Sequence, residues 1–379
     1  MGATTTPKRV RSMKLWKRAA GAIKDRNSIW ASSLSSKTPY RNPEVEVAVI
    51  KATSHDEGRV DYKNVQCVFQ CLRTSPYYTK PLIAAISRRM GRTRSWVVAL
   101  KGLMLMHGVF CSNVPAVQKI GRLPFDLSDF ADRHSALSKA VCVNAFVRTY
   151  FSFLDQKSVI AGREWSRVGN KLNEPVPIAH QLMRLDEMQT LLDKLLRVKP
   201  LTGELMQFDL IVEAMDCVII EIFQIYSCIC DGVARVLLRI YDSGKLEAAI
   251  ALKVLKRATT QGHKLQEYFE FCRKYGILSA SEFPKAVEIP EEDIKELERI
   301  INGAPEKIIE MEVETKDDGD SKTLVLRTIV TQKWEVFDED VKVCHSGFVD
   351  QQSAIETEPK LVQKQPVIAP MALPDLITF

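Results

Sequence analysis

Four basic side chains lie close together in the stretch KATSHDEGRVDYKN, residues 51–64, and could bind an anion. Lys51 and Lys63 bracket the stretch, and His55 and Arg59 lie between them. The apolar segment before it reads as a helix that ends here, and a second helical pattern follows. The N-terminus of that second helix, flanked by lysines, could hold an anion such as a phosphate. The alternative is an ordinary turn with solvated lysines, the usual state of exposed lysines.

Catalytic chemistry is not indicated anywhere in the chain. The sequence contains no phosphate-binding loop, no GxSxG motif and no HExxH motif. His107 lies in the apolar run LMLMHGVF and is expected to be a hydrogen-bonded core histidine rather than a base. The nine cysteines form no CxxC pair and the six histidines are scattered singly, so neither a metal site nor a cofactor is expected. The chain is therefore predicted not to be an enzyme.

Charge is distributed unevenly along the chain. Residues 1–100 carry 19 Lys and Arg against 6 Asp and Glu, whereas residues 301–379 carry 8 against 15. The basic N-terminal part and the acidic C-terminal tail predict two different partners, and the basic part is expected to contact an anionic surface. The basic N-terminal part of the chain has no exposed aromatic residues interleaved with its basic ones and no recognisable nucleic-acid-binding module. Nucleic acid is therefore not an expected partner. The cysteines are expected to be reduced thiols in a cytosolic protein.

Apolar residues recur at helical spacing through most of residues 1–300, and Gly and Pro separate the helical runs. Asn42 followed by Pro43 predicts the start of one helix, and a polar break is expected over residues 158–175. The pattern predicts an all-α fold of stacked antiparallel helix pairs, in a right-angled or a superhelical, solenoid-like array of about ten helices. The predicted helices cover residues 13–25, 43–53, 62–74, 80–90, 94–111, 135–155, 178–198, 206–241, 244–275 and 291–302.

The character of the sequence changes after Gly303, where charged, broken and proline-bearing stretches predict a mostly disordered tail. We therefore expect a helical domain over residues 1–300 and an acidic tail of low order over residues 301–379. The beginning of the chain, MGATTT, fits the simple pattern for N-myristoylation with Gly2 and Thr6, but Pro7 disfavours the modification.

One predicted helix contains an apolar segment, residues 214–238, that is long enough to cross a membrane. It includes Asp216, Glu221, Asp231 and Arg235, and a charge at the centre of a bilayer costs about 2.5–3.5 kcal/mol on insertion scales. The segment is therefore predicted to be a long buried helix, and any contact with a membrane is expected to be peripheral.

Five blocks of the sequence resemble the ANTH-domain clathrin-assembly family, especially its plant members. They keep the family order and span roughly residues 12–290. The resemblance implies an all-α superhelical domain that binds phosphatidylinositol 4,5-bisphosphate, in an adaptor that promotes clathrin-coat assembly during endocytosis. The blocks are TRSWVVALKGLMLMHGVF (93–110), FVRTYFSFLD (146–155), LLDKLLRVKP (191–200), IFQIYSCICDGVARVLLRIYD (222–242) and FEFCRKYGILSASEFP (269–284).

The family's lipid motif resembles a lysine, nine residues, a second lysine, any residue, a lysine or arginine, and then a histidine or tyrosine. Lys51 and Lys63 match it, whereas Asp61 replaces the second lysine and Asn64 replaces the final histidine or tyrosine. The resemblance thus implies a headgroup site at Lys51 and Lys63. Exchanging a lysine for an aspartate weakens the attraction to an anionic membrane by about 2 kcal/mol before screening.

Arg59 is expected to contribute to this site and to compensate partly for Asp61. His55, in the same loop, is a further candidate for the site, but it could equally cap a helix or pack against the protein. Headgroup binding is nevertheless predicted to be weaker or less selective than the family pattern implies. The alternative is a helical protein–protein scaffold, binding a SNARE or cargo, with lost or weak lipid binding.

The family's tail carries short motifs for clathrin and its adaptors. Trp334 and Phe337, in KWEVFDED, resemble a WxxF-acidic motif that adaptor appendage domains recognise. The alternative is that both aromatic side chains fold back on the helical body. The resemblance implies the clathrin heavy chain, an adaptor appendage domain and a vesicle SNARE as partners. It also implies a cytoplasmic protein, peripheral at clathrin-coated pits, clathrin-coated vesicles and the Golgi apparatus.

Overall fold

The computed structural model describes residues 7–34, 41–168, 177–239, 244–281 and 291–302. All of them belong to the first of two units, Met1–Glu306, and none to the second, Lys307–Phe379. The all-α prediction is confirmed, because the described residues form eleven α-helices and no strand. The helices are α1 (Pro7–Leu34), α2 (Pro43–Ala52), α3 (Tyr62–Thr74), α4 (Thr79–Arg92), α5 (Trp96–Cys111), α6 (Pro115–Gln118), α7 (Leu137–Val168), α8 (Ile178–Leu195), α9 (Asp209–Leu237), α10 (Lys245–Lys274) and α11 (Glu291–Asn302).

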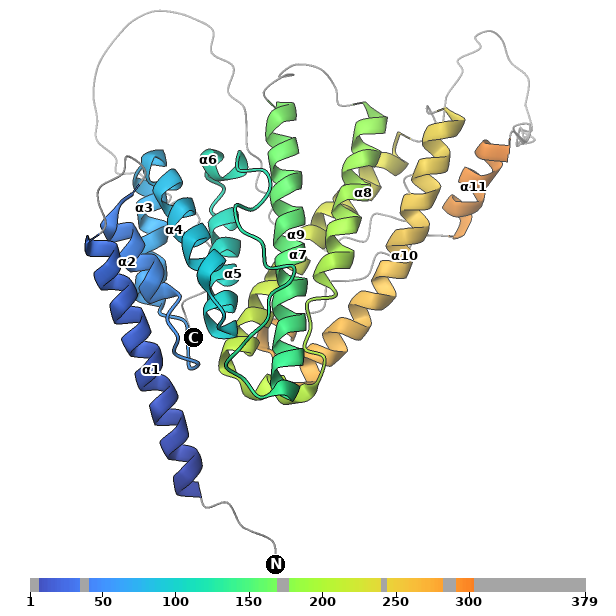
Figure 1. Cartoon of the computed structure of the whole chain (residues 1–379). Coiled ribbons are helices and arrows are strands. Elements are labelled where there is room, and N and C mark those ends of the chain that lie inside the picture. The colour runs from blue at the N-terminus through green and yellow to red at the C-terminus, as the bar shows by residue number, and fades with distance from the viewer. Residues whose placement is uncertain (1–6, 35–40, 169–176, 240–243, 282–290, 303–379) are drawn as a thin grey trace, which may run out of the picture. The chain divides into compact units, whose positions relative to one another are not determined.

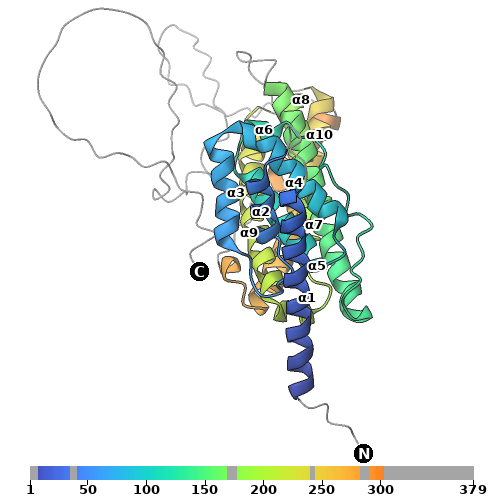
Figure 2. The same cartoon turned by 60° about the vertical axis from the view of Figure 1, so that its left-hand side comes forward.

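The helices pack largely in the order of the chain, as Figure 1 shows. Helix α2 packs on α1, α3 and α4, and α4 leads to α5, which packs on α7. The second half continues through α8, which contacts α7, α9 and α10, and ends with α11 on α10. Contacts between near neighbours in the chain are the arrangement that short-connected helical arrays require. Figure 2 brings α1 and α2 to the front of this arrangement.

The start of α2 shows how the sequence positions a helix. The side chain of Asn42 accepts hydrogen bonds from the backbone N–H groups of Glu44 (3.0 Å) and Val45 (3.2 Å). Pro43 occupies the first turn, where a missing N–H is harmless. The predicted cap is therefore confirmed, and it fixes the direction in which α2 runs toward the basic stretch at residues 51–64.

The predicted polar break over residues 158–175 is wrong for its first part, because α7 continues to Val168. Ser158 and Ile160 are buried, and the Ser158 hydroxyl donates to the carbonyl of Asp155. Trp165 lies under the ammonium of Lys119, 4.9 Å from the ring centroid. The burial of Ser158 and Ile160 and the contact between Lys119 and Trp165 are tertiary interactions, and they stabilise a helical segment whose sequence alone lacks a clear apolar stripe.

By length and composition alone, helix α9 is long and apolar enough to cross a membrane, as the sequence indicated. Half of its most apolar window is buried inside the protein, and the helix packs on α8 and α5. Ile211, Val218 and Ile222 are fully buried. These contacts are those of a core helix, so the predicted buried helix is observed.

A buried polar cluster joins α5, α7 and α9. The ring of His107 hydrogen-bonds the hydroxyl of Tyr150 (2.8 Å) and the carboxylate of Glu221 (3.0 Å), and the same carboxylate pairs with Lys157 (2.5 Å). Burial lowers the pKa of His107, but Cys111 and Glu221 more than compensate and raise it to about 9. His107 is thus a hydrogen-bonded core residue, as expected from its apolar surroundings.

The raised pKa of His107 predicts a pH-dependent stability. A histidine whose pKa is higher in the folded than in the unfolded state stabilises the fold below the unfolded pKa, and this contribution is lost as pH rises through about 9. The free energy of unfolding, measured with urea at several pH values, should therefore fall less steeply above neutral pH in His107→Gln than in the wild type. Exposed His263 supplies the control substitution, His263→Gln. Equal slopes for all three proteins would contradict the assignment.

Candidate anion-binding surface

The basic stretch forms the end of α2, a loop and the start of α3. Lys51 lies in the last turn of α2 and Lys63 in the first turn of α3, and both are exposed. Arg59, in the loop between them, is also exposed, whereas His55 is half-buried. Three of the four predicted headgroup residues are therefore available to an anion in solution or on a surface. Their contact with phosphate stays a prediction.

Asp61, the residue that departs from the family motif, caps α3. Its carboxylate accepts hydrogen bonds from the backbone N–H of Asn64 (3.2 Å) and from the side-chain amide of Asn64 (2.6 Å). The helix N-terminus is thus already supplied with a negative charge from within the chain. An external anion would have to be held by the basic side chains instead. The spacing of Asp61 and Asn64 is a capping signal that the sequence contained.

A buried lysine from α5 holds the loop from beneath. The side chain of Lys101 donates to the hydroxyl of Ser54 (3.2 Å) and to the carbonyls of Asp56 (2.8 Å) and Arg59 (2.7 Å). Lys101 is only 1% exposed, so burial lowers its pKa, and nearby carboxylates, first Asp56, oppose that shift. One ammonium group therefore satisfies three oxygens of a loop that has no regular structure. Sequence reasoning missed this residue, which lies within the apolar run WVVALKGL.

Helix α9 adds a second attachment at the end of the loop. The backbone N–H of Val60 donates to the carboxylate of Glu213 (3.3 Å), more than 150 residues further along the chain. Burial raises the pKa of Glu213, and the Val60 N–H and the nearby charge of Lys101 act in the opposite direction. The loop is therefore tied to both α5 and α9.

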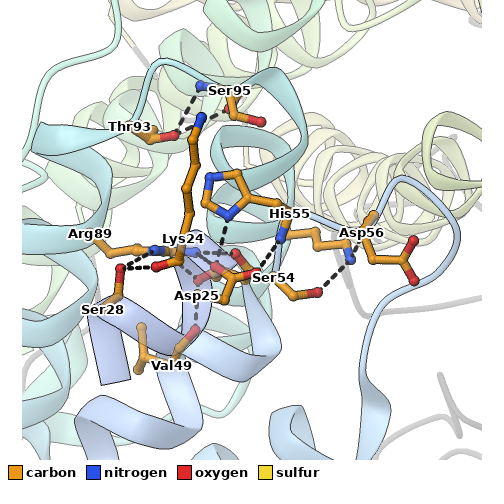
Figure 3. Close-up of polar contacts among 12 residues, drawn as sticks. Lys24, Asp25, Ser28, Val49, Ser54, His55, Asp56, Arg89, Thr93 and Ser95 are labelled. Carbon is orange, nitrogen blue, oxygen red and sulfur yellow. Dashed lines mark hydrogen bonds and ion pairs between the residues drawn. The ribbon is translucent and has the colours of Figure 1, made fainter. Parts of the chain in front are cut away.

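The third attachment is to α1 and α4 through Asp25 (Figure 3). The Asp25 carboxylate bonds the ring Nδ1 of His55 (2.7 Å) and accepts from the His55 backbone N–H (2.9 Å) and from Arg89 (2.7 Å). Arg89 also donates to the carbonyl of Thr53 (2.9 Å). Burial raises the pKa of Asp25, but the bonds from His55 and Arg89 outweigh this and hold it below its usual value. The His55 ring is thus already bonded within the protein.

Close packing of α1 on the loop depends on Gly21. A Cβ at this position would lie 2.8 Å from the Cβ of His55, a separation that real side chains do not show. Further toward the N-terminus, Arg18 pairs with Asp56 at 3.5 Å, with both side chains largely exposed. An exposed pair of this kind contributes at most about 1 kcal/mol.

Comparison with known proteins identifies the family. The ANTH domain matches residues 44–303. The chain belongs to the ANTH-domain family. Two relatives from Arabidopsis thaliana cover 97% of this chain over their whole length: "Putative clathrin assembly protein At1g25240", 46% identical, and "Putative clathrin assembly protein At1g68110", 43% identical. A third, "Putative clathrin assembly protein At1g14686", is 43% identical over 78% of this chain and 84% of its own length.

Family membership confirms the resemblance seen in the sequence. ANTH clathrin-assembly proteins are non-enzymatic adaptors, in agreement with the expectation that this chain catalyses no reaction. The predicted adaptor motif, Trp334 and Phe337, and the myristoylation signal at Gly2 lie outside the described residues. The predicted boundary between a domain over 1–300 and a tail over 301–379 stays a prediction.

The contacts of Lys101 predict what its removal does to the loop. Lys101→Met keeps the length of the side chain and its packing but leaves two backbone carbonyls and a hydroxyl without their donor. Since a hydrogen bond to a charged group contributes about 1.5–3 kcal/mol, amide hydrogen exchange should accelerate at least roughly tenfold in residues 54–60. Exposed Lys253 provides the matched control, Lys253→Met. Unchanged exchange in residues 54–60 of Lys101→Met would show that the loop does not depend on this ammonium.

Proposed function

We propose that the chain is an endocytic adaptor whose helical domain docks on membranes containing phosphatidylinositol 4,5-bisphosphate and whose tail recruits the clathrin coat. Relatives named as clathrin assembly proteins match this chain over their full length, which supports the coat-related part of the proposal. The observation that carries the membrane part is the loop between α2 and α3, which is fixed from beneath and leaves Lys51, Arg59 and Lys63 exposed.

The proposed docking is electrostatic. Each basic residue close to an anionic membrane contributes about 1 kcal/mol, and the contribution falls with ionic strength. Rigid attachment of the loop reduces the entropy that would be lost when Lys51 and Lys63 engage a phosphorylated headgroup. Asp61 opposes the attraction, but its cap on α3 explains how a carboxylate at this position benefits the fold.

Charge reversal at the loop should abolish the preference for the bisphosphate lipid. We expect Lys51→Glu with Lys63→Glu to reduce cosedimentation with phosphatidylcholine vesicles that contain phosphatidylinositol 4,5-bisphosphate to the level seen without that lipid. The control exchanges two exposed lysines of α10 in the same way, Lys245→Glu with Lys253→Glu. Equal pelleting of wild type and both variants with either vesicle would favour the alternative, a protein–protein scaffold without lipid binding.

Asp61 allows a test in the opposite direction. Asp61→Asn keeps a side chain that caps helices well but removes the negative charge beside the basic residues. Binding to the same vesicles should become roughly fivefold tighter, which corresponds to about 1 kcal/mol. Asp209→Asn, in the first turn of α9, is the matched control. No gain for Asp61→Asn would place the headgroup away from this loop.

We also propose that Trp334 and Phe337 bind an adaptor appendage domain, because two aromatic anchors followed by acids suit recognition as an exposed peptide. Trp334→Ala with Phe337→Ala in the full chain should then abolish capture by an immobilised appendage domain, while Phe348→Ala in the same tail should not. Retained capture by the double variant would assign recruitment to another segment. A vesicle SNARE, the clathrin heavy chain and the Golgi apparatus remain parts of the proposal that rest on the family resemblance alone.

A further inference from the structure

A cavity of about 800 Å³ lies beside the loop and shares only His55 with the four predicted headgroup residues. It is walled by α1, α2, α4, the turn that joins α4 to α5, and residues 133–134 before α7. Neither Lys51 nor Arg59 nor Lys63 lines it. The volume is within the range of pockets that hold small molecules.

The lining of this cavity is strongly basic. One carboxylate, that of Glu46, faces seven lysine and arginine side chains, six of them arginines. Arginine presents a planar fork of donors that fits phosphate oxygens, and a cavity rich in arginine is therefore suited to phosphate rather than to a single carboxylate. The seven are Lys24, Arg41, Arg88, Arg89, Arg92, Arg94 and Arg133.

Part of this charge is neutralised within the protein. Glu46 accepts from Arg41 through two bonds of 2.7 Å and from Arg88 at 2.6 Å. Burial raises the pKa of Glu46, but these arginines outweigh burial and hold it below its usual value, so the carboxylate is ionised at neutral pH. Arg89 is paired with Asp25. Three of the seven cations, Arg41, Arg88 and Arg89, are thus already paired with carboxylates of the protein.

Four cations of the cavity have no acidic partner among the described residues: Lys24, Arg92, Arg94 and Arg133. In Figure 3 the side chain of Lys24 extends from α1 across to the turn that holds Thr93 and Ser95. Asp132, the neighbour of Arg133 in the chain, does not line the cavity, and its carboxylate accepts from the backbone N–H groups of Trp96 and Ser135.

We propose that this cavity is a second anion site, distinct from the one proposed at Lys51, Arg59 and Lys63, which takes a compact ligand bearing several phosphates. Four uncompensated cations around one cavity favour several charges on one small molecule over an acidic peptide, whose charges spread along an extended chain. A soluble polyphosphate and a phosphorylated lipid headgroup share this chemistry. Binding would neutralise the cations that α1 and the α4–α5 turn now place near one another.

The test uses the full chain and three double variants. Arg92→Gln with Arg94→Gln removes two uncompensated charges from the cavity, and Lys51→Glu with Lys63→Glu alters only the proposed headgroup site. Arg235→Gln with Arg273→Gln, exposed positions on α9 and α10, is the matched control. Inositol hexakisphosphate is titrated calorimetrically into each protein, and each is cosedimented with phosphatidylcholine vesicles with and without phosphatidylinositol 4,5-bisphosphate.

We expect the cavity variant to bind inositol hexakisphosphate at least roughly tenfold more weakly than the wild type and the control, because charge-assisted bonds are lost. Unchanged vesicle binding by that variant identifies a soluble polyphosphate as the ligand, and reduced vesicle binding identifies the lipid headgroup. Affinity equal to that of the wild type overturns the cavity site, even if the loop variant loses all binding.

A second measurement on the wild type keeps the proposal testable if the cavity variant unfolds. Hydrogen exchange with and without inositol hexakisphosphate should show new protection in residues 91–95, at the α4–α5 turn. Protection confined to residues 51–64 would leave the cavity empty and contradict the proposal, while supporting the proposed headgroup site.

Discussion

The buried ammonium of Lys101 is the contact on which the proposed surface depends. An irregular loop between two helices has few hydrogen bonds of its own, and a buried charge is costly unless it is fully bonded. In this protein the loop oxygens need donors and the buried ammonium needs acceptors. Lys101 meets both needs, because it donates to Ser54, Asp56 and Arg59. The result is a loop held from the core side, so that its basic side chains face outward.

Hydrogen bonds to other helices also hold the loop in place. Glu213 of α9 accepts from Val60, and Asp25 of α1 bonds His55 and Arg89. Four helices distant in sequence therefore determine the position of one loop. The fixed loop also leaves two adjacent basic regions, one on its exposed side and one in the cavity between α1, α2 and α4. Two phosphate sites would let a membrane and a soluble anion act on the same end of the domain.

Sequence reasoning was strongest where a local pattern determines the structure. The helix starting after Asn42 and the core placement of His107 followed from capping and apolar spacing, and both are observed. Sequence reasoning was weakest where the structure depends on contacts between residues that are distant in the sequence. Residues 158–168 lack a clear apolar stripe but are helical because of packing against distant segments. Lys101 could not be recognised as a loop anchor, since nothing local distinguishes a lysine that meets a loop from one that reaches solvent.

The candidate site was predicted in part. The exposure of Lys51, Arg59 and Lys63 fits both sequence interpretations, an anion site and a turn with solvated lysines, whereas the bonds of His55 and the capping role of Asp61 emerged from the structure. The most direct test of the account is the hydrogen-exchange footprint of the full chain on vesicles with and without phosphatidylinositol 4,5-bisphosphate. The account predicts protection in residues 51–64 that appears only with the bisphosphate lipid. Protection elsewhere alone, or the same protection on both vesicles, would contradict it.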